Sequence, residues 1–219
     1  MKNKRQFEGL IFDLDGTLIN SFEDIADAMN SVLQQHNFPI HETQAYKHFV
    51  GNGLRNLVRS TLPENHDEEL VNKCLDSMID LYRNNCLNKT KLYDGIGDLL
   101  DELVSRKLKL TIFSNKADEL TKKIVLALLP NWNFEAVIGL TTEAHKKPNP
   151  LVALQISDKL GIRPENMIYV GDSGVDMQTA NNAGMYAVGA LWGFRTKDEL
   201  TLNGAKYFLN YPMDLIKIL

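Results

Sequence analysis

The stretch FDLDGTLINS carries two carboxylates, Asp13 and Asp15, directly after a short apolar run. Residues two apart on an extended chain point the same way, so both carboxylates would face one small volume where the first predicted strand ends. Like charges this close need a cation beside them or a shared proton. Gly16 then allows the backbone to turn sharply or to approach a ligand. Alone, the pattern fits a solvated turn equally well, because Asp and Gly are common loop residues.

Two further stretches carry polar residues where apolar runs end. LTIFSNK finishes in Ser114 and Asn115, which we expect at the start of a helix whose unpaired backbone N–H groups favour an anion. EAHKKPNP contains Lys147 directly before Pro148, and proline restricts the conformation of the residue that precedes it. Taken separately, these are a good helix cap and a solvated charge.

A second pair of acids follows the run MIYVG. Asp172 ends this predicted strand, and Asp176 comes four residues later, one helical turn away if a helix has begun. Asp176 could equally be a carboxylate at a helix N-terminus, where the helix dipole stabilises a negative charge. Two acids in this position suit a hard divalent cation held by oxygens, such as Mg²⁺. Four strand ends thus supply paired acids, a hydroxyl, a lysine and paired acids, which together predict a phosphate and magnesium site.

Short apolar runs predict the strands that must position these residues. They are GLIF, LTIFS, FEAVIG, MIYVG, YAVGAL and KYFL, and helical patterns separate them from Gly95 onward. This alternation predicts an α/β fold with a Rossmann-like parallel sheet. The carboxyl ends of parallel strands share one edge, where open α/β sheets bind their ligands.

The segment between the first two runs is far longer than one crossover helix requires. Its amphipathic pattern predicts a helical domain over residues 19–88, inserted into a core made of residues 1–18 and 89–219. Its first helix is expected to begin at Ser21, with Asp24 completing a capping box.

The composition argues against several partners. The net charge is −4 with mixed signs along the chain, so there is no basic footprint for nucleic acid and no polybasic patch for a membrane surface. No apolar stretch approaches the roughly 18 residues of a membrane span. We therefore expect a cytoplasmic protein that acts on a small molecule. No feature of the sequence indicates an oligomeric state.

As a set, DLDGTL, FSNK, KPNP and GDSGVD resemble the four motifs of the haloacid dehalogenase-like phosphohydrolase superfamily, over roughly Phe7 to the end of the chain. The resemblance implies that Asp13 is the nucleophile, which forms an aspartyl phosphate. Asp15 would be the general acid and then the general base. The presence of an acid at position 15 argues against a dehalogenase, which in this superfamily lacks it.

The same resemblance implies how metal and phosphate are held. Mg²⁺ would bind the Asp13 carboxylate, the Asp15 backbone carbonyl and Asp172, while Asp176 would orient Lys147 or a metal-bound water rather than bind metal directly. The residues expected to hold the phosphoryl oxygens are Ser114, the N–H of Asn115, and Lys147.

Within the insert and after the last motif, SFEDIADAMNSVL, FVGNGLRNLVRSTLP and LWGFRTKDEL resemble the phosphoglycolate phosphatase subfamily. This resemblance implies that the insert is a cap that reads the leaving group and that the substrate is 2-phosphoglycolate. The segment GNG before a helix could present N–H groups to a carboxylate, with Arg55 and Arg59, one turn apart, as helpers. The candidate substrate residues are Asn52 and Arg55. A flexible loop beside surface arginines is at least as good an interpretation.

Other activities stay open from the sequence. Sugar phosphates, nucleotides and pyrophosphate are alternative substrates. A mutase of the beta-phosphoglucomutase type is disfavoured, because it carries a His where this chain has Phe22, Glu23 and Asp24. A phosphonate hydrolase would need a Schiff-base lysine in the insert. The helix SFEDIADAMNSVL has none, but Lys47 and Lys73 elsewhere in the insert leave this alternative open. A non-catalytic binding protein would be free to lose the acids of the site, yet they are present.

Overall fold

The structure is a computed structural model that describes residues 6–219. The chain divides into two compact units, a larger one of Met1–Ile19 with Leu92–Leu219 and a smaller one of Asn20–Lys91. The boundaries expected from the sequence were 19 and 88. That the smaller unit acts as a cap stays a prediction.

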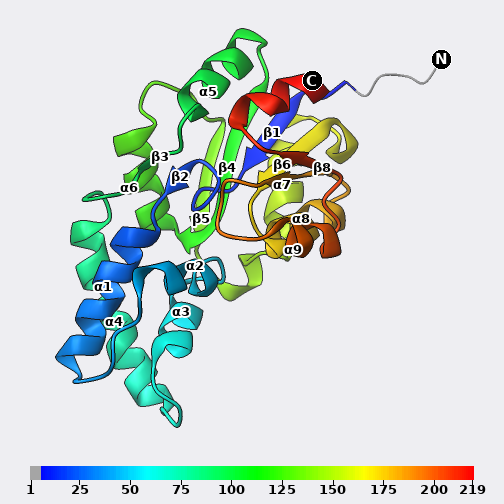
Figure 1. Cartoon of the computed structure of the whole chain (residues 1–219). Coiled ribbons are helices and arrows are strands. Elements are labelled where there is room, and N and C mark those ends of the chain that lie inside the picture. The colour runs from blue at the N-terminus through cyan, green and yellow to red at the C-terminus, as the bar shows by residue number, and fades with distance from the viewer. Residues whose placement is uncertain (1–5) are drawn as a thin grey trace. The chain divides into compact units, whose positions relative to one another are not determined.

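The larger unit is built on a six-stranded sheet in the order β5-β4-β1-β6-β7-β8, in which all strands are parallel (Figure 1). The strands are β1 (Gly9–Phe12), β4 (Lys109–Ala117), β5 (Ala136–Leu140), β6 (Met167–Gly171), β7 (Tyr186–Ala190) and β8 (Tyr207–Leu209). All six coincide with the apolar runs, so the predicted parallel sheet is confirmed. β1 and β6 are buried along their whole length, which explains why they appear in the sequence as continuous apolar runs.

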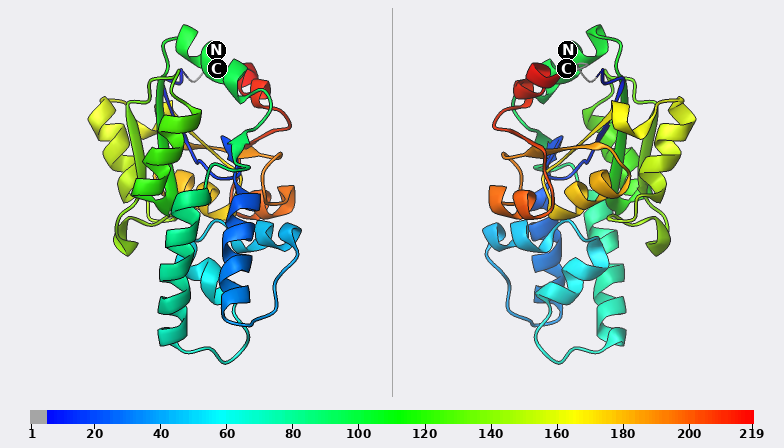
Figure 2. Two further views of the ribbon diagram at one scale, coloured as in Figure 1. Left: turned by 90° about the vertical axis from the view of Figure 1, so that its left-hand side faces the viewer. Right: turned by 90° about the vertical axis from the view of Figure 1, so that its right-hand side faces the viewer.

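Helices flank this sheet on both faces (Figure 2). They are α5 (Ile96–Ser105), α6 (Asp118–Leu128), α7 (Leu151–Leu160), α8 (Gly174–Asn182) and α9 (Lys197–Leu202), with short 3₁₀ turns at Glu143–His145, Pro164–Asn166 and Pro212–Ile218. One core cluster joins α7 and α8 to the sheet and includes Ile11, Phe113, Ile156, Tyr169 and Met177. Burial of these apolar side chains fixes the strands whose ends carry the polar residues.

The smaller unit is helical, as the sequence predicts. Its helices are α1 (Phe22–Gln35), α2 (Tyr46–Phe49), α3 (Leu54–Thr61) and α4 (Glu68–Asn85), with a 3₁₀ turn at Thr43–Ala45. α1 and α4 lie side by side in both views of Figure 2. Apolar side chains of α1 and α4 are buried, among them Ile25, Met29, Val32, Cys74 and Met78.

The chain enters and leaves the smaller unit through paired segments, because β2 (Ile19–Asn20) and β3 (Lys91–Leu92) form a two-stranded sheet. Close by, the buried Asp24 carboxylate accepts hydrogen bonds from the backbone N–H groups of Lys89 and Thr90 and from the Thr90 hydroxyl. The capping box predicted from Ser21 and Asp24 is therefore wrong, and Ser21 makes no side-chain cap hydrogen bond. Because the Asp24 carboxylate already accepts these hydrogen bonds, it does not bind the N–H groups at the start of its own helix.

Within residues 6–219, no helix combines the length and the apolar character that crossing a membrane requires.

Candidate active site

The first two acids lie at the carboxyl end of β1, in the middle of the sheet. The Asp13 N–H donates to the carbonyl of Val170 on β6 at 2.9 Å, so Asp13 still continues the sheet before the chain turns. Gly16 makes the turn at φ 87°, and a Cβ at this position would lie 2.3 Å from Asp172 Oδ2. Only glycine fits here, because the position needs both a left-handed backbone and empty space.

Lys147 lies between two of the acids. Its Nζ is 2.8 Å from Asp13 Oδ1 and 2.6 Å from Asp176 Oδ1, and its side chain is 1% exposed. The contact with Asp176 is a hydrogen bond, and the contact with Asp13 is an ion pair. The lysine that the sequence singled out before Pro148 therefore lies inside the acidic cluster rather than in solvent.

Asn115 positions this lysine through its side-chain amide. Its Oδ1 accepts from the Lys147 N–H at 2.9 Å, and its Nδ2 donates to the Lys147 carbonyl at 3.4 Å. The expectation that Ser114 and Asn115 start a helix is wrong, because β4 continues to Ala117 and α6 begins at Asp118. The two residues lie where the β4–β5 register shifts between Phe113 and Ala117, so a strand irregularity presents them.

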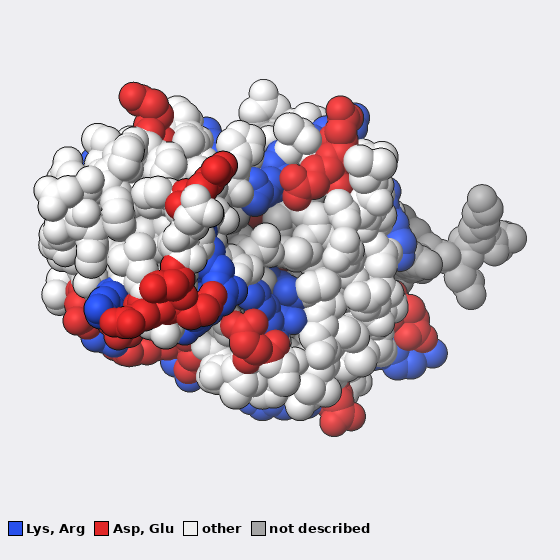
Figure 3. All heavy atoms as spheres, turned by 90° about the horizontal axis from the view of Figure 1, so that it is seen from below, with Lys and Arg blue, Asp and Glu red and all other residues white. Residues whose placement is uncertain are grey.

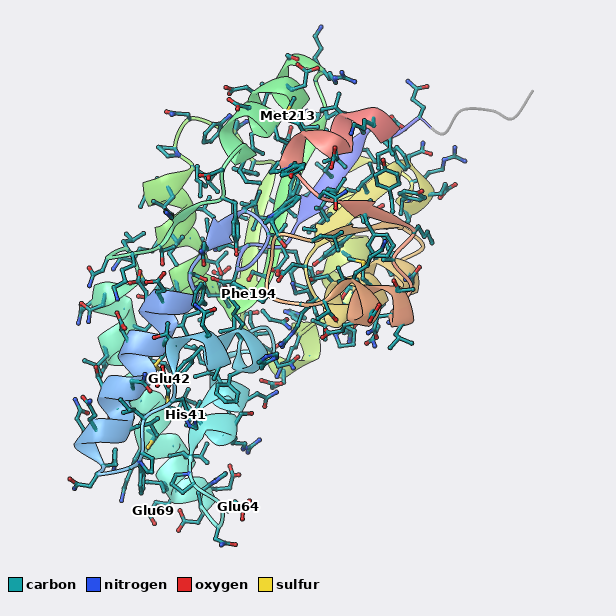
Figure 4. All side chains as sticks on the ribbon, in the orientation of Figure 1. His41, Glu42, Glu64, Glu69, Phe194 and Met213 are labelled. Carbon is teal, nitrogen blue, oxygen red and sulfur yellow. The ribbon has the colours of Figure 1, made fainter. Side chains whose placement is uncertain are left out.

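Asp172, at the end of β6, is held by residues that the sequence did not single out for this role. Its Oδ1 accepts from the Thr17 hydroxyl at 3.2 Å, and its Oδ2 accepts from the backbone N–H of Phe194 at 2.7 Å. Phe194 follows β7 and is labelled in Figure 4. Trp192 in the same loop donates its indole N–H to the Thr17 carbonyl at 3.0 Å. A Cβ on Gly193 would lie 2.3 Å from Asp172 Cβ, so only a glycine fits here. This glycine is the one residue of LWGFR whose type points to the close contact.

Asp176 uses both of its oxygens. Oδ1 accepts from Lys147, and Oδ2 accepts from the backbone N–H and the hydroxyl of Ser173 in a capping box at the start of α8. A carboxylate with this many donors is fixed in orientation, and it in turn fixes the ammonium of Lys147.

These acids converge. One carboxylate oxygen each from Asp13, Asp172 and Asp176 lies within 4.8 Å of the others, and all three residues are buried. Burial, and next the charge of Asp176, raise the pKa of Asp13 from 3.8 to about 7 although Lys147 opposes the change. Burial and the other two carboxylates hold the pKa of Asp172 well above its ordinary value.

The electrostatics of the cluster suit a divalent cation. Burial lowers the pKa of Lys147, but the carboxylates of Asp13 and Asp176 outweigh it and raise that pKa well above the ordinary value, so the ammonium stays charged. One ammonium among three buried carboxylates leaves uncompensated negative charge. An all-oxygen donor set of this kind fits a hard cation.

The residues expected to contact substrate lie in the smaller unit, where the two arginines have partners. Arg55 donates to Asn72 at 2.7 Å and lies 3.4 Å from Glu68, which also pairs with Arg59 at 2.7 Å. Asn52 is exposed. On the face seen in Figure 3, Lys and Arg side chains likewise adjoin Asp and Glu side chains. These contacts tie α3 to α4, and the substrate role of Arg55 and Asn52 stays a prediction.

Known proteins match the chain over almost its full length. A family model described as haloacid dehalogenase-like hydrolase matches residues 10–190. A phosphoglycolate phosphatase from Aquifex aeolicus is 33% identical over 96% of this chain and 95% of its own length, and one from Chromobacterium violaceum is 31% identical over 99% and 98%. A solved structure of a predicted phosphoglycolate phosphatase from Haemophilus somnus superposes with a TM-score of 0.89 at 26% identity, covering 97% of this chain and 98% of the other. The chain belongs to the haloacid dehalogenase-like hydrolase family.

Proposed function

We propose that this hydrolase is a Mg²⁺-dependent phosphomonoester hydrolase that works through an aspartyl-phosphate intermediate. The observation that carries the proposal is the buried cluster of Asp13, Asp172 and Asp176 around Lys147, at the carboxyl edge of the sheet. The family supports a small phosphate ester as substrate. Both relatives described above bear the name phosphoglycolate phosphatase.

In the proposed reaction, a carboxylate oxygen of Asp13 attacks phosphorus, and the bond from phosphorus to the leaving oxygen breaks. Asp15 gives a proton to that leaving oxygen. Asp15 then takes a proton from the water that attacks the aspartyl phosphate, which releases inorganic phosphate and restores Asp13. Of the two acids that follow β1, Asp13 makes the covalent attack and Asp15 transfers the protons.

Three groups would hold the transferred phosphoryl oxygens. Lys147 supplies a point charge, and the Asn115 N–H supplies a backbone donor. The Ser114 hydroxyl accepts from the Lys116 N–H at 3.2 Å, so its own proton points away from that bond and is a donor for phosphate.

The residues that would hold Mg²⁺ are Asp13 and Asp172 through their carboxylates and Asp15 through its backbone carbonyl. When bound, the ion neutralises charge on the phosphate so that one anion can attack another. Thr17 and the Phe194 N–H orient the Asp172 carboxylate for this task. Asp176 orients the Lys147 ammonium, because its two oxygens accept hydrogen bonds from Lys147 and Ser173.

For the substrate we propose 2-phosphoglycolate, with the smaller unit as a cap and with Asn52 and Arg55 recognising the substrate carboxylate. Arg55→Ala should then raise KM for 2-phosphoglycolate with little change in kcat. Arg83→Ala is the matched control, because Arg83 is 42% exposed against 41% for Arg55 and pairs with Asp80 on its own helix. Equal KM values for the two variants would refute the assignment of Arg55.

The decisive experiment is a steady-state panel of kcat/KM values over 2-phosphoglycolate, sugar phosphates, nucleotides and pyrophosphate, with Mg²⁺ or EDTA. Turnover of 2-phosphoglycolate well above the rest, dependent on Mg²⁺ and abolished in Asp13→Asn, is the expected result. A preference for another ester would keep the mechanism and refute the substrate. Binding without turnover of any ester would refute the enzyme itself.

A further inference from the structure

A second buried lysine contacts the other acid of the DLDG stretch. Lys116 Nζ lies 2.6 Å from Asp15 Oδ1, with 4% of the lysine side chain and 11% of the aspartate side chain exposed. The two residues are 101 positions apart in the chain, and both belong to the larger unit. Lys147 contacts Asp13 and Asp176, so the two lysines of the site contact different acids.

The backbone of Lys116 is fixed on both sides. Its N–H donates to the Ser114 hydroxyl at 3.2 Å, and its carbonyl accepts from the Thr121 hydroxyl at 3.2 Å. It lies in the irregular part of β4, within the register shift between Phe113 and Ala117. The ammonium is therefore delivered from a rigid element rather than from a loop.

A buried ion pair is weak evidence for stability alone, because burying both charges costs about as much as their attraction returns. The pair also acts on geometry, because an ammonium bonded to Oδ1 restricts the rotation of the Asp15 carboxylate. Asp15 is the residue for which a fixed orientation matters most, since proton transfer needs the carboxyl group within hydrogen-bond reach of the leaving oxygen.

We propose that Lys116 is a positioning residue that holds the Asp15 side chain in the orientation from which it protonates the leaving group. The inference rests on the proposed phosphatase function. Lys116 acts through Asp15 and has no contact of its own with the ester.

The test compares Lys116→Met with the wild type on two esters, 2-phosphoglycolate and 4-nitrophenyl phosphate. The alkoxide leaving group of the first needs a proton, whereas 4-nitrophenolate leaves without one. Because kcat/KM reports only steps up to departure of the leaving group, Lys116→Met should lower it for 2-phosphoglycolate by about tenfold or more and for 4-nitrophenyl phosphate by less than about twofold. Lys116→Arg should recover part of the loss.

A double-mutant cycle completes the design. In an Asp15→Asn background, Lys116→Met should change kcat/KM for either ester by less than about twofold, because Asp15 no longer carries the proton. This double variant also removes both charges of the buried pair, so it remains interpretable if Lys116→Met alone fails to fold. Lys122→Met is the matched control, since Lys122 pairs with Asp118 at 2.7 Å on the surface of α6.

The outcomes separate the inference from the function on which it rests. Equal losses of kcat/KM on both esters would show that Lys116 contacts substrate or only supports the fold. A full Lys116→Met effect in the Asp15→Asn background, with a raised KM, would show the same. Either result would refute the positioning role but not the phosphatase function. No turnover of either ester by the wild type would refute the proposed function and the inference together.

Discussion

Replacing the proposed nucleophile should stabilise the protein when no metal is present. Burial and neighbouring carboxylates raise the pKa of Asp13 from 3.8 to about 7. This difference of roughly three pKa units corresponds to about 4 kcal/mol, the cost of keeping Asp13 ionised in the folded state. Asn has the shape of the protonated carboxyl and no charge, so Asp13→Asn should recover up to about that free energy of unfolding.

The pH dependence has a definite sign. A carboxyl whose folded pKa lies above its unfolded pKa binds its proton more tightly in the folded state, so the wild type loses stability as the pH rises from about 4 to about 7. The gain from Asp13→Asn should therefore be absent near pH 4, grow across this window and level off above pH 7. This direction is opposite to that of a carboxylate stabilised by a salt bridge.

Urea denaturation in EDTA measures the effect. Both tryptophans, Trp132 and Trp192, lie in the larger unit with Asp13, so their fluorescence reports the unfolding of the relevant part. Asp76→Asn, an exposed acid of the smaller unit, is the control and should leave this transition unchanged. Added Mg²⁺ should stabilise the wild type and not Asp13→Asn. A variant less stable than the wild type at pH 8 in EDTA, or a gain that does not depend on pH, would refute the reasoning.

Three further substitutions have defined outcomes. Gly193→Ala places a Cβ 2.3 Å from Asp172 Cβ, so the Mg²⁺ concentration for half-maximal activity should rise about tenfold or more; an unchanged value would contradict the assigned role of this loop. Asp24→Ala removes the acceptor for the N–H groups of residues 89–90, which should cost about 2 kcal/mol and speed hydrogen exchange of those amides. Tyr46→Phe deletes a hydroxyl that donates to Asn30 Oδ1 at 2.7 Å, which should lower the free energy of unfolding by about 1 kcal/mol. Urea unfolding followed by circular dichroism measures this change.

The sheet and the principal acids could be predicted because both follow from local patterns. Buried parallel strands need continuous apolar runs, and six such runs became the six strands. Asp13 and Asp172 directly follow their runs, and Lys147 lies in the loop that follows β5. The carboxyl ends of parallel strands share one edge of the sheet, so these three residues could be placed together without knowledge of any contact.

The residues that hold the acids could not be found in this way. Lys116 meets Asp15 only because β1 and β4 are neighbours, and its position in the chain gives no sign of that partner. Phe194 acts through its backbone N–H, which every residue except proline possesses. Such contacts depend on tertiary structure, which a single sequence does not reveal.

Two expectations about helix starts were wrong, for different physical reasons. Ser114 was expected to start a helix, but β4 continues past it, and Asp24 was expected to cap α1, but the returning chain supplies better donors. The Asp24 carboxylate binds backbone groups that tertiary structure brings near it. Ser114 lies within a strand, and its hydroxyl accepts from the Lys116 N–H two residues along the chain.

The pairing of β2 with β3 bears on how the larger unit can fold around so long an insertion. The first and last residues of the excursion, Ile19–Asn20 and Lys91–Leu92, are held together, and the Asp24 bonds to Lys89 and Thr90 lie next to them. The entropy of closing this loop is offset by contacts between the two ends of the excursion, so the parallel strands β1 and β4 pair as if only the crossover through α5 joined them. The effective contact order of the sheet is therefore low. The length of the helical insertion can change without slowing the pairing of β1 with β4.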